Sequence, residues 1–183
     1  RHIAAPKRLE SLAALRAAIP NLFVVEDQIR NAMHTFQLAL AHQASNGGVV
    51  HLKDDIMLCD RFVERVEAAV AERPDDPIQF FSRRGADAVQ GSRWMSGSSF
   101  SMNQAFYLPR GMSGRLLEFS ETWSRIEEHP TGYDLMMADA FKSWKQRYLL
   151  HVPSLVQHRV GVSLIDRRRA WSRQSATFEG GLL

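Results

Sequence analysis

The chain has 183 residues, of which 45% are hydrophobic and 23% are charged, so it can bury a core as a single domain. The one cysteine, Cys59, excludes a disulfide framework and a cysteine-rich zinc site. No apolar run approaches the ~20 residues that cross a bilayer, and no signal peptide is visible, so we expect a cytoplasmic protein. The net charge of +3 is uneven, because arginines gather at 83–84 and 167–169. This distribution indicates either a polyanionic partner or a solvated surface.

The first half alternates short apolar runs with helical patterns. Strands are predicted at 2–5, 22–25 and 49–52. Helices are predicted at 8–19 and 31–44, and a third begins at Asp60, a candidate N-cap. Strands separated by helices imply crossover connections, so we predict an α/β fold with a mainly parallel, Rossmann-type sheet flanked by helices.

The second half is less regular. Strands are expected at 78–81 and 105–108, and a helix at 115–123. The Gly- and Ser-rich segment 85–101 is predicted to be a long functional loop or a β-excursion. Met137, Phe141, Trp144 and Tyr148 share one face at helical spacing, which predicts another helix.

Ligands of parallel sheets bind beyond the carboxyl ends of the strands, where Asp27, Asp54 and Asp55 are expected to converge. Two adjacent carboxylates inside an apolar run are costly unless they bind a cation, and Mn²⁺ or Mg²⁺ prefers such oxygen ligands. The alternative for Asp54 and Asp55 is a solvated turn at the strand end. Asp27 is expected either to cap the next helix or to contact a nucleoside.

Three later residues carry further candidate chemistry. His158 is either a hydrogen-bonded structural residue or a metal ligand beside the carboxylates. Asp134 follows a Gly-Tyr turn at a helix start, where it is either an N-cap or a general base for an acceptor hydroxyl. Asp139, further along the same helix, competes for the role of base.

Together these segments resemble the GT-A glycosyltransferases over roughly residues 3–163. The resemblance rests on a Pro-containing basic loop after the first strand, an acid-ended second strand, an acidic motif after the third, and the late run 153–158. The last run is similar to the ending of small enzymes of bacteria and phages. Lys53 departs from the pattern, because an acid or a neutral residue is commoner there. The positions implied to bind a nucleotide-sugar are Ala5, Pro6, Arg8, Asp27, Lys53, Asp54 and Asp55.

The resemblance implies that Asp55 and His158 hold Mn²⁺ or Mg²⁺ and that Asp134 is the base of an inverting transfer. We predict UDP-glucose as the donor. Acceptor contacts are expected from Trp94, Asn103 and Gln104. The predicted acceptor is a hydroxymethylated pyrimidine in DNA, with the arginine clusters binding phosphates, and a bacterial surface glycan or a protein is the rival.

The expected organisation is one GT-A-like domain over residues 1–165, followed by a basic tail at 166–183. Residues 1–82 form the nucleotide-sugar half and residues 83–165 the acceptor half. A phage-encoded enzyme of this kind would act in the host cytoplasm. Two other classes remain open: a nucleotidyltransferase, which would usually carry a Gly-rich phosphate loop, and a non-catalytic nucleic-acid-binding module.

Overall fold

The computed structural model describes residues 6–29, 31–43, 47–101, 103–159 and 174–180. The helices are α1 (Pro6–Ala18), α2 (Ala32–Gln43), α3 (Phe62–Glu72), α4 (Asp87–Gln90), α5 (Met112–Thr122) and α6 (Tyr133–Ser143), with the 3-10 turn η1 (Gly97–Ser99). The strands are β1 (Val49–Leu52), β2 (Ile56–Leu58), β3 (Ile78–Gln79), β4 (Arg93–Ser96), β5 (Ala105–Leu108), β6 (Arg147–Leu150) and β7 (Val156–His158). Among the described residues, no helix is long and apolar enough to cross a membrane.

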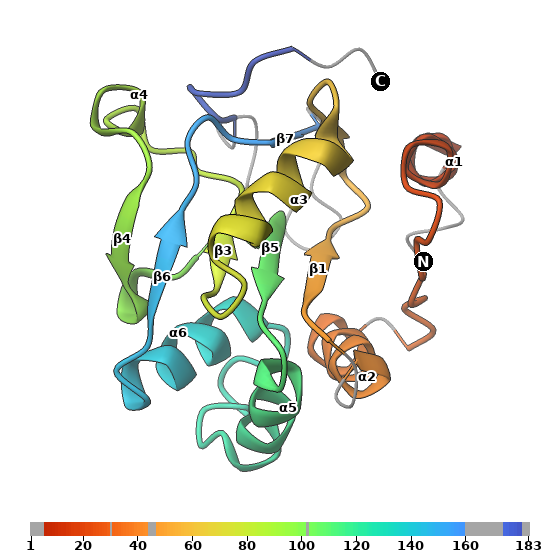
Figure 1. The fold of residues 1–183 in the computed structure, drawn as a ribbon. Coiled ribbons are helices and arrows are strands. Elements are labelled where there is room, and N and C mark those ends of the chain that lie inside the picture. The colour runs from red at the N-terminus through yellow and green to blue at the C-terminus, as the bar shows by residue number, and fades with distance from the viewer. Residues whose placement is uncertain (1–5, 30, 44–46, 102, 160–173, 181–183) are drawn as a thin grey trace.

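A five-stranded sheet in the order β1-β5-β3-β6-β4 forms the centre of the molecule, and β2 and β7 form a separate two-stranded sheet (Figure 1). Within the large sheet only β3 and β6 pair in parallel, whereas the other three pairs are antiparallel. The mixed α/β class is therefore confirmed, but a mainly parallel, Rossmann-type sheet is not found in the described part of the chain. The parallel sheet was inferred from alternating strands and helices in the first half of the chain. Of the strands expected there, only β1 belongs to this sheet, and its other strands come later in the chain.

Several predicted elements need correction. The segment expected as a strand at 2–5 lies outside the described residues, and 22–25 forms no strand. Arg61, not Asp60, precedes helix α3, and it does so in the left-handed region at φ 52°. The long segment 85–101 does contain a β-excursion, which is strand β4.

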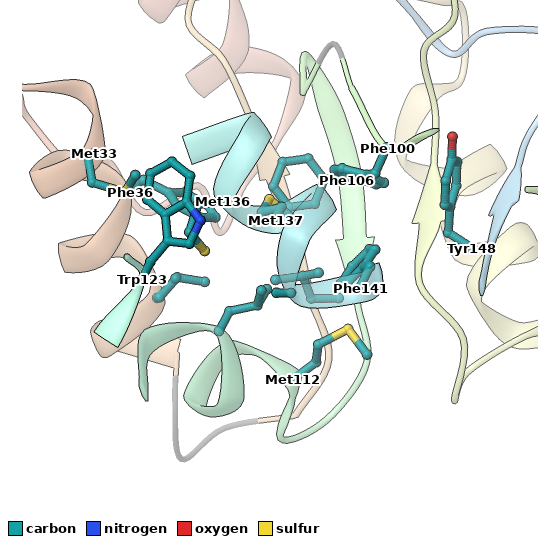
Figure 2. Packing of buried hydrophobic residues seen from close by; sticks show 14 of the residues in the cluster. Met33, Phe36, Phe100, Phe106, Met112, Trp123, Met136, Met137, Phe141 and Tyr148 are labelled. Carbon is teal, nitrogen blue, oxygen red and sulfur yellow. The ribbon is translucent and has the colours of Figure 1, made fainter. Parts of the chain in front are cut away.

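Each strand places alternate side chains on opposite faces of the sheet, and each face has its own core. Leu108 of β5 and Leu150 of β6 pack with residues of α2, α5 and α6 on one face. Figure 2 shows this cluster, where aromatic rings and methionines from the helices and the sheet pack together. On the other face, Tyr107 and Ile78 pack with residues of α1, α3 and β2. The architecture is thus three layers, with helices on both faces of the sheet.

Residues 174–180, expected to belong to a basic tail, pack onto the domain. Ser175 and Thr177 are buried, and both hydroxyls lie within hydrogen-bond distance of the Ser154 hydroxyl, at 2.8 and 3.2 Å. The Gln157 side chain accepts a hydrogen bond from the Ser175 amide at 2.8 Å and donates one to the Ser175 carbonyl at 3.2 Å. This segment therefore holds strand β7 in place. Arg167, Arg168 and Arg169 lie outside the described residues.

Candidate functional site

Three strands of the large sheet end at the same edge. Strands β1 and β3 both run antiparallel to β5, and β6 runs parallel to β3, so β1, β3 and β6 share one direction (Figure 1). Lys53, Asp54 and Asp55 follow β1 at this edge, and the start of β5 lies beside them. The Lys53 amide donates a hydrogen bond to the Gln104 carbonyl at 2.9 Å, which fixes the chain just before Asp54 and Asp55.

Asp55 and His158 come together because β2 pairs with β7. The register sets Ile56 opposite His158, and the His158 Nε2 atom lies 3.4 Å from Asp55 Oδ2. The Arg159 amide donates to the Asp55 carbonyl at 2.9 Å, which extends the pairing by one residue. Both side chains are partly exposed, at 17% for His158 and 26% for Asp55. The two residues expected to share a metal ion are therefore neighbours with access to solvent.

A lysine lies at the centre of the charged groups around this edge. The Lys53 ammonium lies 5.3 Å from the centre of the Tyr133 ring, at the start of α6. Burial lowers the pKa of Lys53, but the interactions with Tyr133, Asp55 and Asp134 outweigh it, so the pKa lies above its ordinary value. Burial also raises the pKa of the Tyr133 hydroxyl. Lys53 is thus charged at neutral pH, and Tyr133 is a neutral partner that the sequence analysis missed.

Asp134 and Asp139 lie in different environments along α6. Asp134 is the second residue of the helix and contributes to the raised pKa of Lys53, whereas the N-cap position is Gly132. Asp139 accepts a hydrogen bond from Trp123 Nε1 at 3.0 Å and pairs with Arg125 at 3.1 Å. Asp139 therefore anchors the segment after α5. Of the two candidate bases, Asp134 is the one whose charge acts on Lys53.

The spacing of Asp55 and His158 fits one ion. Neighbouring ligands of an octahedral ion with ~2.1 Å bonds lie ~3.0 Å apart, close to the observed 3.4 Å. Within the described residues no group of three or more His, Cys, Asp or Glu side chains could hold a metal. Mg²⁺ takes six ligands, so an ion held by Asp55 and His158 would need its other ligands from water or a bound molecule.

The expected nucleotide-binding residues before β1 do not join the cluster around Lys53. Ala5 lies outside the described residues, and Pro6 and Arg8 lie in the first turn of α1. Helix α1 packs against β2, where the Ser11 hydroxyl donates to the Ile56 carbonyl at 3.5 Å. Asp27 accepts a hydrogen bond from the Asn31 amide at 2.9 Å, but the Asn31 side chain accepts one from the His34 amide at 3.1 Å, so Asn31 caps α2 and Asp27 supports the turn before it.

The three residues expected to contact the acceptor do not form one surface. Asn103 and Gln104 are each only 1% exposed, so neither can read a base edge in this arrangement. Asn103 donates to the Met137 sulfur at 3.5 Å. Trp94 lies on β4, the opposite edge strand from β1, with the Arg147 guanidinium 5.3 Å from its ring centre. Strand β4 lies four strand spacings, or roughly 19 Å, from β1 across the sheet.

A polar pocket of about 180 Å³ opens beyond the carboxyl end of β3. Its lining includes Ser82, Arg83 and Arg84 from the segment after β3, and Ser101 from the segment before β5. Both arginines are exposed. The pair Arg83-Arg84 stood out in the sequence as a charge cluster, but nothing in the sequence indicated that the chain folds a pocket around it.

No family model matches this chain, and a search of the curated proteins finds no match.

Proposed function

We propose that this protein is a metal-assisted glycosyltransferase that moves a sugar, with UDP-glucose as the proposed donor, to an acceptor hydroxyl. The observation that supports the proposal is the convergence of Lys53, Asp55, Asp134 and His158 at one edge of the sheet, from three separated parts of the chain. A diphosphate leaving group needs cations, and an acceptor hydroxyl needs a base. This cluster holds candidates for both.

Asp55 and His158 are the proposed ligands of Mn²⁺ or Mg²⁺. The bound ion would neutralise the negative charge that develops on the nucleoside diphosphate as the glycosidic bond breaks. The Lys53 ammonium carries a second positive charge beside the same carboxylate and would contact a donor phosphate directly. Asp54, next to this pair, is proposed to bind the ribose or the sugar.

Asp134 is the proposed general base. The acceptor oxygen forms a bond to the anomeric carbon on the face opposite the diphosphate, whose oxygen keeps the electron pair of the broken bond. The proton of the acceptor hydroxyl passes to the Asp134 carboxylate. A single displacement of this kind inverts the anomeric configuration.

The acceptor proposal has narrower support. Arg83 and Arg84 are exposed at the same edge as the donor site, and a hydroxymethylated pyrimidine in duplex DNA offers both phosphates and a primary alcohol. Of the residues expected to contact an acceptor, Asn103 and Gln104 are buried. Any reading of the base would therefore involve other side chains. The GT-A resemblance belongs to this proposal as well.

The test is incubation with a panel of nucleotide-sugars, with and without Mn²⁺, followed by measurement of the released nucleoside diphosphate. We expect Mn²⁺-dependent release from a UDP-sugar, with Asp139→Asn as a matched control that keeps the activity. Labelled sugar is then supplied with DNA containing 5-hydroxymethylcytosine or 5-hydroxymethyluracil, unmodified DNA or a bacterial glycan fraction. Release of pyrophosphate from nucleoside triphosphates, without sugar transfer, would replace this proposal with a nucleotidyltransferase.

A further inference from the structure

Among the described residues, the lining of the pocket beyond β3 is positively charged. Arg83 and Arg84 line it, and in the described part of the chain neither pairs with a carboxylate. The acid nearest in sequence, Asp87, is fully buried and paired with Arg93. Its negative charge is therefore already balanced by a third arginine, and two positive charges remain at the pocket.

The walls of this pocket are fixed by hydrogen bonds. The Ser82 amide donates to the Ser154 hydroxyl at 3.1 Å, and the Ser82 hydroxyl accepts from the Arg84 amide at 3.2 Å. The Gln79 side chain donates to the Ser101 carbonyl across the pocket. The Arg84 guanidinium itself donates to the Ser99 carbonyl at 3.4 Å, so its position is partly set in advance. Preorganised donors of this kind lose less freedom when an anion binds.

The size and lining of the pocket suit one phosphate group. A volume of about 180 Å³ is many times the ~10–15 Å³ that a cavity needs to hold one water, so it is large enough for a phosphate and part of its ester. Guanidinium groups match phosphate oxygens in paired hydrogen bonds, and the hydroxyls of Ser82 and Ser101 add neutral donors.

The pocket also lies at a useful distance from the proposed donor site. Strand β3 is two positions from β1 in the sheet order, which is a lateral distance of about 10 Å. Both sites lie at the edge where β1 and β3 end, so one acceptor molecule can reach both. A phosphate held here would keep the acceptor at the sheet edge where Lys53 and Asp55 lie.

We propose that Arg83, Arg84, Ser82 and Ser101 form a phosphate-binding subsite that holds a phosphate ester of the acceptor, distinct from the site for the donor diphosphate. The assignment to the acceptor rests on the proposed function, whereas the phosphate site itself does not. Two sources share this chemistry: the phosphodiester backbone of a nucleic acid and a small phosphate monoester.

The experiment measures binding to the full chain by titration with inorganic phosphate, a sugar phosphate and a 12-nucleotide oligonucleotide at several salt concentrations. We expect Arg83→Ala and Arg84→Ala each to weaken binding at least ~10-fold and to lower the salt slope for the oligonucleotide by about one. Arg110→Ala is the control, because it removes one exposed arginine at the opposite edge, beyond the carboxyl end of β5, and should change affinity less than ~2-fold. Arg83→Lys keeps the charge and tests the paired geometry.

The outcomes separate the sources and the two proposals. Pocket-dependent binding of the oligonucleotide alone identifies a nucleic acid, and binding of the sugar phosphate alone identifies a small ester. If Arg110→Ala weakens binding as much as the pocket variants, or if no phosphate ligand binds, the subsite is wrong. A UDP-sugar that fails to stabilise the wild-type chain, while pocket-dependent phosphate binding persists, refutes the glycosyltransferase but leaves the subsite standing.

Discussion

Removing either proposed metal ligand should abolish stabilisation by donor and Mn²⁺ without unfolding the protein. Asp55 and His158 approach within 3.4 Å and are both partly exposed, so Asp55→Asn and His158→Ala are tolerable substitutions in the apo protein. A donor present at ~100 times its dissociation constant stabilises a fold by about 2.7 kcal/mol. For a domain of this size each kcal/mol moves Tm by about 2–4 °C, which predicts a wild-type shift of roughly 5–10 °C.

The variants should show almost none of this shift. Even a group one step outside the ligands of a metal costs 10–100-fold in affinity when it is removed, so the loss of a ligand should reach at least ~100-fold. Binding that is 100-fold weaker leaves about 0.4 kcal/mol of stabilisation at the same donor concentration, or a shift of about 1 °C. The assay is thermal unfolding with UDP-glucose and Mn²⁺, with Arg110→Ala as the control.

The double variant distinguishes a shared ion from two independent roles. If both residues hold one ion, Asp55→Asn combined with His158→Ala should lose no more than either single variant, because the site is already empty. A His158→Ala protein that melts at a lower temperature but keeps the full donor shift would refute the reasoning. The pair would then be a structural hydrogen bond between β2 and β7.

Three further predictions concern single side chains. Asp134→Asn should bind donor normally but transfer sugar at least ~100-fold more slowly in a single-turnover assay, the usual scale for loss of a general base, and near-normal turnover would move the role elsewhere. Asp139→Asn should lower the free energy of unfolding by about 1–2 kcal/mol in urea titrations, because Trp123 Nε1 and Arg125 lose their acceptor, and should leave transfer intact. His51 should make stability fall as the pH drops from 6.5 towards 4, because burial lowers its pKa in the folded chain to about 4, so the unfolded chain binds the proton first. The linked loss of stability is up to ~3 kcal/mol. His51→Phe keeps a ring stacked on Phe106 and should flatten this part of the plot of stability against pH. An unchanged slope would contradict the role of His51 in this pH dependence.

Helical periodicity predicted most helices well, because the spacing of apolar residues reports directly which side chains are buried. The pattern failed at Tyr148, which was expected on one helix with Met137 and Phe141. Helix α6 ends at Ser143, and Lys145 turns the chain with φ 54°, so Tyr148 enters strand β6 and reaches the same core from the sheet. The spacing therefore predicted correctly that Tyr148 shares a core with Met137 and Phe141, but predicted wrongly that the three residues share a helix.

Individual residues of the candidate site could be predicted from the sequence, but the contacts between them could not. Asp54-Asp55 after an apolar strand and Asp134 at a helix start are local signals, whereas the contact of Asp55 with His158 depends on two three-residue strands. Strands this short leave almost no alternation to recognise. The neighbourhood of Lys53 and Tyr133 is a tertiary contact between β1 and α6, and no local pattern encodes it.

The charge balance of the cluster bears on how an ion would enter. Lys53 and Arg159 offset two of the three carboxylates near the end of β1, Asp54, Asp55 and Asp134, so the side chains around the proposed metal position carry a net charge of about −1. A divalent ion bound by these groups alone would leave net positive charge in a partly buried site, which is unfavourable. A nucleoside diphosphate would remove this excess, because the negative charge of its phosphates is larger than the net positive charge of the site with the ion bound. On the proposed function, the ion and the nucleotide-sugar are therefore expected to bind together, and the phosphates of the donor would supply the negative charge that Lys53 offsets.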